Sequence, residues 1–379
     1  MRSVIRIVAL AAALAAALPA AGKDSLKVGA LLAITGPASF LGAPEARTLA
    51  LLAEEMNAKG GIGGRRLELV VKDTGGSPEK AVSLARQLIE EEEVFAIIGP
   101  TTSGETLAVK PIAEEGRTLL ISLAAAEVIV NPVTPHVFKT APKDRDAVEL
   151  IFERMRKVGI TRIGLLSSNT GFGKAGKEQA EKLAPSYGIE LALSEVYDKA
   201  ATDLTAEVTK LKAARVQAIL NWSTEPAQAI VLKNARQMGM TVPIFQSHGF
   251  ANVQYVAAAG AAAEGVIFPG SRLLVVDSLP ASHPQKGVLE AYKKAYEARY
   301  REEVSAFGGH AWDALMILAR AVEVGGADRD RVRSAVEGLT GFVGTSGVFR
   351  FSPADHNGLG RDAFELLTVR QGRFVPLGP

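Results

Sequence analysis

Cysteine is absent from all 379 residues of the chain. The protein therefore has no disulfide bond, no thiolate nucleophile and no zinc–thiolate site, and no cysteine that could carry a lipid anchor. Its stability has to come from core size, which a chain of this length supplies as two or three domains. With 47% hydrophobic and 22% charged residues, the composition is typical of a globular protein.

An excess of charge of one sign is also missing. The chain has 43 Lys and Arg residues against 41 Asp and Glu residues, and 41 of each remain when Arg2 and Arg6 are set aside. Neither the total nor any run of Lys or Arg provides the basic face that a nucleic-acid-binding protein needs. We therefore expect no nucleic-acid partner.

The only apolar run that resembles a targeting or membrane segment lies at the start of the chain. Arg2 and Arg6 precede an Ala- and Leu-rich stretch over residues 8–18, Pro19 ends it, and small residues follow at 20–22. This order is typical of a cleaved secretory signal peptide over residues 1–22, and the stretch is too short for a permanent membrane-spanning helix. We expect a soluble periplasmic protein without a lipid anchor, with a membrane anchor as the alternative.

Beyond residue 25 the sequence alternates strand and helix patterns in two successive runs. In the first run we expect strands over residues 26–33, 67–73, 95–99 and 118–123 and helices over 44–59, 78–92 and 104–115. In the second run we expect strands over 162–168, 190–196, 218–222 and 242–246 and helices over 144–158, 174–187, 204–213 and 226–238. The remaining chain is mainly helical (284–300, 308–324, 329–339) and ends in a hairpin-like pair, 347–351 and 364–369. Such alternation predicts the α/β class: two Rossmann-like lobes with parallel sheets covered by helices.

The carboxyl ends of the predicted strands are rich in small, hydroxyl and amide residues. Ligands of open α/β sheets bind at that edge, and this composition suits hydrogen-bonded recognition of a small polar molecule. The sharpest example is residues 101–105 (TTSGE), where hydroxyl groups precede a helix. The unpaired N–H groups at a helix N-terminus bind a carboxylate or another anion. An ordinary Thr or Ser cap uses the same groups, so both interpretations stay open at this point.

Residues 171–177 (GFGKAGK) match the G-x-G-x-x-G pattern of dinucleotide-binding loops, and Glu195 lies where a ribose-binding acid is expected. Polar residues 167–170 separate the strand from the first glycine, and Glu178 stands where a P-loop needs Ser or Thr. We therefore interpret the glycines as a helix start, and keep as an alternative an exported nucleotide-dependent oxidoreductase that uses Gly171, Gly173 and Gly176. The five histidines lack metal-ligand spacing, so we expect no metal and no other cofactor.

Three motifs resemble those of one family. Residues 57–65 (NAKGGIGGR), 95–100 (FAIIGP) and 262–265 (AAEG) are similar to the branched-chain amino-acid-binding family of ABC-transporter periplasmic substrate-binding proteins. The likeness covers nearly the whole chain after the signal peptide. It implies a type I periplasmic binding fold, a Venus flytrap whose two lobes are joined by a three-segment hinge. Lobe I would hold residues 23–141 and 270–364, and lobe II residues 142–269 and 365–379. The resemblance further implies a monomer that docks on the membrane permease of an ABC importer.

The resemblance also implies a ligand site between the lobes. Ser103, with Thr102 beside it, matches the position that grips the α-carboxylate of an amino acid, together with the next strand's loop. In that loop, which includes Ala124, Ala126 occupies a position where amino-acid binders often have Thr. The other cleft positions implied are Phe40, Phe172, Thr224 and Phe307.

One position departs from the family pattern. His248 stands where amino-acid binders place an acid that pairs with the ligand's ammonium group. A buried ammonium without a carboxylate is costly, and histidine suits a hydrogen-bond acceptor or an anion instead. We therefore expect the ligand to be a small organic carboxylate, with an aromatic body as a candidate. The alternative is a branched-chain or other amino acid whose ammonium group Glu225 receives. No residue pattern argues for catalysis, so we expect no enzyme.

Overall fold

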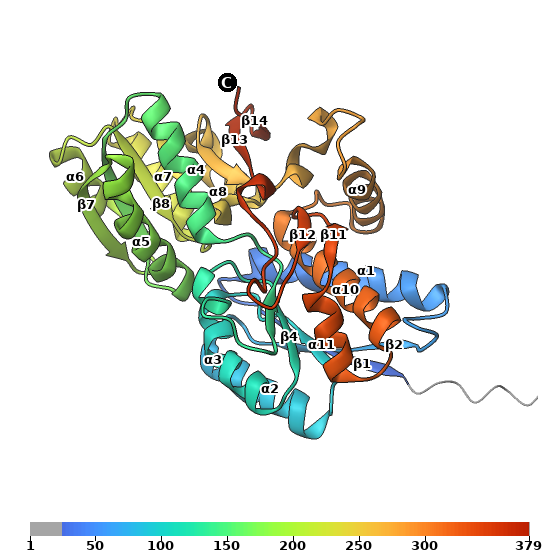
Figure 1. Cartoon of the computed structure of the whole chain (residues 1–379). Coiled ribbons are helices and arrows are strands. Elements are labelled where there is room, and N and C mark those ends of the chain that lie inside the picture. Colours follow the sequence, from blue (N-terminus) through green and yellow to red (C-terminus); the bar gives the residue numbers. More distant parts are fainter. Residues whose placement is uncertain (1–24, 379) are drawn as a thin grey trace, which may run out of the picture.

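The computed structural model describes residues 25–378, so the predicted signal peptide over residues 1–22 lies outside the described part. Two lobes lie side by side, each built around its own sheet (Figure 1). We define lobe I as the elements around the five-stranded sheet and lobe II as the elements around the seven-stranded sheet. The predicted α/β class with a parallel-sheet core in each lobe is confirmed.

The sheet of lobe I is parallel throughout, with the strand order β2-β1-β3-β4-β5. Its strands are β1 (Leu26–Leu32), β2 (Leu67–Asp73), β3 (Ala96–Ile98), β4 (Leu119–Ser122) and β5 (Val137–Lys139). Its helices are α1 (Ser39–Ala58), α2 (Pro78–Arg86), α3 (Ser103–Glu115), α9 (Lys286–Tyr300), α10 (Ala306–Gly325) and α11 (Arg329–Glu337).

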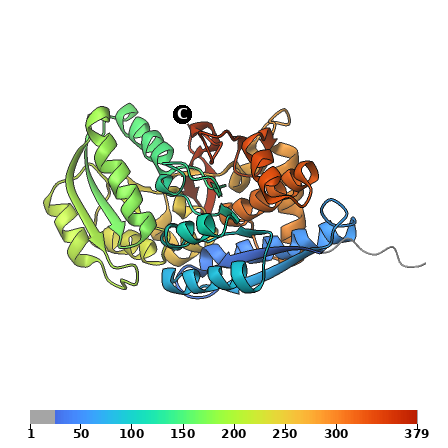
Figure 2. The ribbon, with the colours of Figure 1, turned by 60° about the horizontal axis from the view of Figure 1, so that its bottom comes forward.

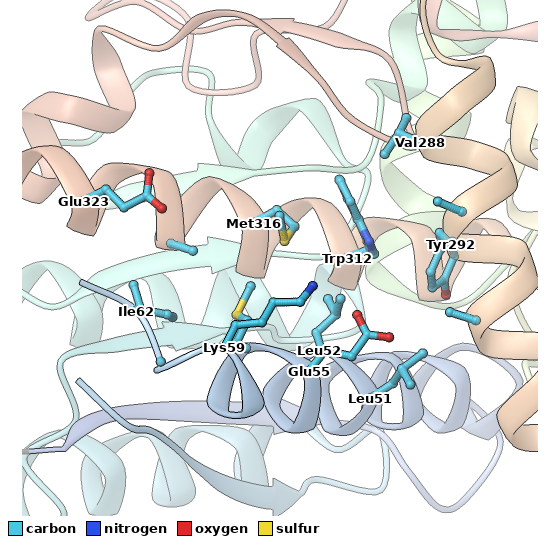
Figure 3. A pocket seen from close by; sticks show the side chains of 15 residues that line it. Leu51, Leu52, Glu55, Lys59, Ile62, Val288, Tyr292, Trp312, Met316 and Glu323 are labelled. Carbon is cyan, nitrogen blue, oxygen red and sulfur yellow. The ribbon is translucent and has the colours of Figure 1, made fainter. Parts of the chain in front are cut away.

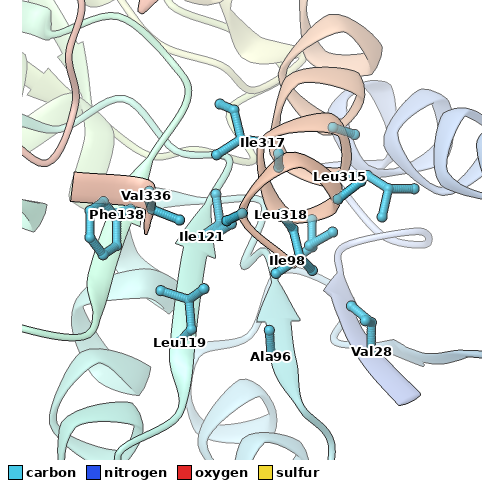
Figure 4. Close-up of a cluster of buried hydrophobic side chains, with 14 of the residues drawn as sticks. Val28, Ala96, Ile98, Leu119, Ile121, Phe138, Leu315, Ile317, Leu318 and Val336 are labelled. Atoms are coloured by element: carbon cyan, nitrogen blue, oxygen red, sulfur yellow. The ribbon is translucent and has the colours of Figure 1, made fainter. Parts of the chain in front are cut away.

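Both faces of this sheet are covered by helices. Val28 of β1 points into a cluster with α1 and α10, whereas Leu31 points to the opposite face, against α2 and α3. Figure 4 shows the first cluster, in which Ile98 of the sheet lies beside Leu318 of α10. Because successive strand residues face opposite sides and both sides are buried, the inner strands β1, β3 and β4 are apolar at nearly every position, whereas the edge strand β2 is not.

The sheet of lobe II has the order β14-β13-β10-β9-β8-β6-β7. Its strands are β6 (Arg162–Ser168), β7 (Glu190–Tyr197), β8 (Ala218–Trp222), β9 (Ile244–Gln246), β10 (Ile267–Gly270), β13 (Glu365–Arg370) and β14 (Arg373–Pro376). Its helices are α4 (Asp144–Lys157), α5 (Gly171–Leu183), α6 (Thr205–Ala213), α7 (Ala227–Gln237) and α8 (Val253–Ala259). Leu165 and Leu220 pack toward α4 and α5, and Leu166 and Ile219 pack toward α6 and α7.

The predicted hairpin between residues 347–351 and 364–369 is wrong. The first of these segments, β12 (Val348–Arg350), pairs with β11 (Thr340–Val343) in a separate two-stranded sheet. The second forms β13, which pairs with β10 and with β14 of lobe II. Gln371 and Gly372 both have positive φ at the β13–β14 turn, which is the backbone that a tight hairpin of this hand requires.

Three crossovers connect the lobes: from β5 to α4, from β10 to the 3₁₀ segment η6 (Arg272–Ser278), and from β12 to β13. The red C-terminal segment lies between the lobes in both views (Figure 2). Asn357 of the third crossover donates from Nδ2 to the carbonyls of Lys139 (3.2 Å) and Ala141 (3.0 Å) of the first. The lobe boundaries given above stay a prediction of which segments move together. No helix among residues 25–378 is long and apolar enough to cross a membrane.

Candidate functional site

The carboxyl ends of the strands in both sheets face an interlobe cleft that is divided into two chambers. The inner chamber has a volume of about 30 Å³ and the outer chamber about 170 Å³. Thr102, Phe172 and Thr224 border both. The outer chamber lies between loop residues of lobe I, such as Pro37 and Gly75, and Asn169, Lys199 and Glu225 of lobe II. A molecule held here contacts both lobes, which is the geometry by which a ligand favours a closed form.

Seven of the nine predicted site residues line the inner chamber: Thr102, Ser103, Ala124, Phe172, Thr224, His248 and Phe307. Thr101, from the predicted segment 101–105, lines it as well, and six more residues were not predicted: Leu41, Leu123, Ala125, Ala141, Gly249 and His310. Leu123, Ala125 and Gly249 adjoin predicted residues at strand ends, and this position was the available signal. His310 lies inside α10, far along the chain, and no local pattern marks it.

Ala126 and Phe40 do not line the inner chamber. Ala126 is buried, and its backbone N–H donates to the Ser103 hydroxyl (3.3 Å), so it ties the α3 N-terminus to the loop after β4. Phe40 lies in the first turn of α1, with its ring centroid 5.2 Å from that of Tyr255 in lobe II. Its carbonyl accepts from Asn252 Nδ2 of lobe II at 2.7 Å.

Pro44 explains why the Phe40 carbonyl is available to the other lobe. The predicted helix begins at residue 44, but α1 begins at Ser39 and includes Pro44. Because proline has no N–H, the carbonyl four residues earlier loses its intrahelical donor. That carbonyl belongs to Phe40, and Asn252 supplies the missing hydrogen bond across the cleft. Phe40 therefore lies at a contact between the lobes.

The N-terminus of α3 is capped by Thr102, in agreement with the cap interpretation. The Thr102 hydroxyl accepts from the Glu105 N–H (3.4 Å) and Glu105 Oε2 accepts from the Thr102 N–H (3.1 Å), which forms a capping box. The Thr102 hydroxyl also donates to Glu105 Oε2 (2.7 Å). The Thr102 hydroxyl is thus fully used in hydrogen bonds to Glu105 at the helix N-terminus. The Ser103 hydroxyl only accepts, from Ala126, and its hydrogen has no acceptor among residues 25–378. Of the two predicted hydroxyl groups, Ser103 is the one free to donate into the inner chamber.

His248 forms one wall of the inner chamber. It begins the short 3₁₀ segment after β9, and the rings of Phe172, Trp222 and Phe364 surround it edge-on at 5.3–5.6 Å. Both ring nitrogens are buried, and neither has a hydrogen-bond partner in the described part of the chain. Burial lowers the pKa of His248 well below its usual value, and the positive charge of Lys139 and the proximity of His310 lower it further. The ring is therefore neutral at pH 7, with one donor and one acceptor nitrogen left for a ligand or water.

His310 and Lys139 add to this wall without adding negative charge. His310 Nδ1 is 2.8 Å from Ser346 Oγ, and burial, with a further contribution from Lys139, lowers the pKa of His310 to about 3. The Lys139 amine is fully buried and donates to the carbonyls of Ala125 (2.8 Å) and Ala141 (2.7 Å); burial lowers its pKa to about 7, and the nearby Asp144 carboxylate opposes this shift. None of the residues lining the inner chamber carries a carboxylate. The inner chamber itself therefore has no acidic group that could pair with an ammonium group.

Glu225 is the carboxylate that borders the outer chamber. Its Oε2 accepts from Ser223 Oγ (2.8 Å) and from the Thr224 N–H (3.2 Å), and its Oε1 accepts from Thr224 Oγ1 (3.0 Å). Each carboxylate oxygen has two lone pairs, so Oε1, which accepts once, can accept a further hydrogen bond, whereas both lone pairs of Oε2 are already used. An ammonium group that reaches Glu225 has to extend past Thr224, which separates the two chambers.

The glycines of the G-x-G-x-x-G pattern are explained by close packing. A Cβ atom at Gly173 would lie 1.9 Å from the Ser168 carbonyl oxygen, and one at Gly176 would lie 2.0 Å from Trp222 Nε1. A Cβ at Gly171 would meet the backbone of Gly104 in lobe I. Each glycine thus has a structural reason that involves no nucleotide, which removes the observation behind the oxidoreductase alternative.

A larger hollow in the described residues lies outside the cleft. It is an open groove of about 660 Å³ between α1, α9 and α10, lined by apolar residues such as Leu52, Tyr292 and Trp312 with Lys59 and Glu55 at its edge (Figure 3). All of its lining belongs to lobe I, so closure of the two lobes does not enclose it. The interlobe cleft is therefore the candidate site.

Comparison with known proteins agrees with this architecture. A family model described as periplasmic binding protein matches residues 25–372. The chain belongs to the periplasmic binding protein family. The resemblance inferred from the three motifs is thereby confirmed. Members of this family are periplasmic, and two of the relatives named below are described as binding proteins.

The similarity to each relative extends over most of this chain and most of the relative. It is 26% identical over 323 residues to the leucine-, isoleucine-, valine-, threonine- and alanine-binding protein of Pseudomonas aeruginosa, covering 84% of this chain and 83% of that protein. An extracellular ligand-binding receptor from Rhodopseudomonas palustris superposes with a TM-score of 0.88 at 27% identity, covering 94% and 100% of the two chains. The branched-chain amino acid transporter substrate-binding protein of Streptococcus pneumoniae, in complex with isoleucine, superposes with a TM-score of 0.82 at 26% identity, covering 92% and 97%.

Proposed function

We propose that this protein captures a small aliphatic amino acid in the interlobe cleft and delivers it to the membrane permease of an ABC importer, acting as a monomer in the periplasm. The Ser103 hydroxyl, free to donate at the N-terminus of α3, is the observation that carries the proposal, because a carboxylate is the group that such a position stabilises. The amino-acid ligands of the relatives support the same class.

The chamber surfaces suit the remaining parts of such a ligand. Leu41, Leu123, Phe172 and Phe307 provide an apolar surface for an aliphatic side chain. A buried ammonium group needs a carboxylate partner, and in this arrangement it would point past Thr224 toward Glu225. Ala124 and Phe172 would then contact the ligand from opposite lobes.

A carboxylate without an ammonium group is the second candidate, and His248 favours it. This neutral ring stands where the family resemblance implies an acid, and no carboxylate lines the inner chamber. A small organic acid, aliphatic or aromatic, would use Ser103 in the same way and leave Glu225 without a role.

A matched pair of ligands distinguishes the two candidates. Leucine and 4-methylpentanoate share the carboxylate and the branched chain and differ in the ammonium group. After denaturation and refolding to remove any carried ligand, calorimetry would measure both affinities, with benzoate as an aromatic probe. We expect leucine to bind more tightly than 4-methylpentanoate. Tighter binding of 4-methylpentanoate or benzoate would instead support the organic-acid candidate.

Two substitutions test the residue assignments. Ser103→Ala should weaken any carboxylate ligand about tenfold or more, because a hydrogen bond to a charged group contributes roughly 1.5–3 kcal/mol. Glu225→Gln should weaken leucine and leave 4-methylpentanoate unaffected. If Ser103→Ala binds as tightly as the unaltered protein, the carboxylate lies elsewhere in the cleft.

A further inference from the structure

The first turns of α3 in lobe I and α5 in lobe II meet across the cleft at two glycines. Gly104 is the second residue of α3, and Gly171 is the first residue of α5. We infer that the contact between Gly104 and Gly171 sets how closely the two lobes approach when the cleft closes. The inference rests on the proposed function, in which the ligand is enclosed between the lobes.

The two glycines differ in how much space an added Cβ atom would have. A Cβ atom at Gly171 would lie 2.6 Å from the Gly104 nitrogen and 2.7 Å from its Cα. The shorter distance is 0.8 Å less than the 3.4 Å at which ordinary contact begins. A Cβ atom at Gly104 would instead lie 3.7 Å from the Gly171 nitrogen and 3.8 Å from Pro78 Cγ, which is ordinary contact.

The backbone atoms that a methyl group at Gly171 would meet are held in place. Thr102 and Glu105 form the capping box at the start of α3, and Thr170 caps α5 by accepting from the Gly173 N–H at 3.1 Å. Neither helix end can shift without breaking its own cap. A side chain at position 171 therefore has to be accommodated by separation of the lobes.

Nothing in the local backbone explains glycine at position 171. Neither Gly171 nor Gly104 has a positive φ, so an L-residue fits the conformation of both. Alanine is also the better helix former. By contrast, the neighbouring Gly173 and Gly176 face atoms of their own lobe, Ser168 and Trp222. Gly171 alone in this pattern owes its lack of a side chain to the opposite lobe.

Two further interactions in the described part of the chain join the two lobes in this structure. Asn252 reaches the Phe40 carbonyl, as described above. At the mouth, Glu79 of lobe I has a lowered pKa, chiefly because of hydrogen bonds from its own backbone and from Ser77, with a smaller contribution from Lys199 of lobe II. A separation of 0.8 Å would lengthen a 2.8 Å hydrogen bond to a bridging ligand beyond the range of effective bonds.

The test compares Gly171→Ala with Gly104→Ala, two variants with the same added methyl group on facing glycines. The chain has no cysteine, so Glu79→Cys and Lys199→Cys can be introduced into each background and joined by a bis-maleimide that spans the mouth. This trapping needs no ligand. We expect Gly104→Ala to be trapped at the rate of the parent and Gly171→Ala at least fivefold more slowly.

Three results would overturn the inference: trapping of Gly171→Ala at the parent rate, equal slowing in both variants, or a lower melting temperature of ligand-free Gly171→Ala. The last would show that the methyl group clashes inside lobe II. Isoleucine affinity, measured on the same proteins, should fall at least tenfold in Gly171→Ala and stay unchanged in Gly104→Ala. If isoleucine binds none of the proteins, the proposed function fails while the trapping rates still decide whether Gly171 sets closure.

Discussion

Acidification should destabilise the protein through His310, a buried neutral imidazole in the cleft wall. Burial, with the help of Lys139, holds the pKa of this ring at about 3, against 6.5 in the unfolded chain. For a base with a lowered folded-state pKa, the stabilising contribution is complete above 6.5 and is lost as the pH falls from 6.5 toward 3. In this pH range His310 is protonated in the unfolded state but stays neutral in the folded state.

The magnitude follows from those two values. Between pH 7.5 and pH 5.0 the His310 contribution to the free energy of unfolding should fall by about 2 kcal/mol. The figure is insensitive to the folded-state value, because any pKa well below 5 leaves the folded ring neutral at both pH values. Asp313 acts in the opposite direction. Burial raises its pKa to about 7, so protonation at low pH removes the energetic cost of a buried charged carboxylate. The pH difference of the unaltered protein alone therefore does not isolate His310.

Comparison with His310→Gln does isolate it. Denaturant unfolding at the two pH values, followed by the fluorescence of Trp222 in lobe II and Trp312 in lobe I, would give the four free energies needed. We expect the substitution to remove about 2 kcal/mol of the destabilisation on acidification. The comparison variant is His283→Gln, which changes a partly exposed ring outside the cleft; burial lowers the pKa of this ring too, so a smaller effect of the same sign is expected. A difference below about 0.5 kcal/mol between the unaltered protein and His310→Gln would refute the reasoning.

Two further predictions concern packing and closure. Gly176→Ala should lower the free energy of unfolding by roughly 1–3 kcal/mol or more, because its methyl group would overlap Trp222 Nε1. Gly287→Ala, which has no neighbour within 4 Å, should raise it by about 0.5 kcal/mol, and equal effects in chemical denaturation would contradict this account. Asn252→Asp keeps the cap that Asn252 provides to Gln254 but removes its donor to Phe40. It should slow the cross-mouth trapping several-fold while the melting temperature stays within a degree or two, and an unchanged trapping rate would count against the Phe40–Asn252 contact.

The sequence predicted most of the fold because the repeating elements are encoded locally. The strands over residues 67–73, 162–168 and 218–222 were predicted to the residue, since each is an apolar run between turn signals. The β11–β12 pairing was missed because two short strands offer little period-2 pattern, and only their contacts define partners. The start of α1 was missed because Pro44 usually marks the first turn of a helix.

The site was predicted where it lies at strand ends and missed where it depends on distant segments. Ser103 and Phe172 follow strands, and the rule that ligands bind at the carboxyl edge located both. His310 reaches the chamber from a helix more than 60 residues beyond the last cleft strand that was predicted, so only the tertiary structure places it there. Phe40 was assigned to the ligand because its role as a contact to the other lobe depends on Pro44 and Asn252 together.

The three crossovers also determine when each lobe can be completed as the chain is made. The sheet of lobe I is finished at β5, but one of its faces is covered by α10, which begins only at Ala306. Lobe II receives its last two strands from residues 365–376. A chain emerging from the ribosome from its N-terminus therefore leaves apolar sheet surface uncovered until almost all of it has been synthesised. Lobe II therefore becomes stable only after the twelve-residue segment 365–376, which forms β13, its turn and β14, has been added.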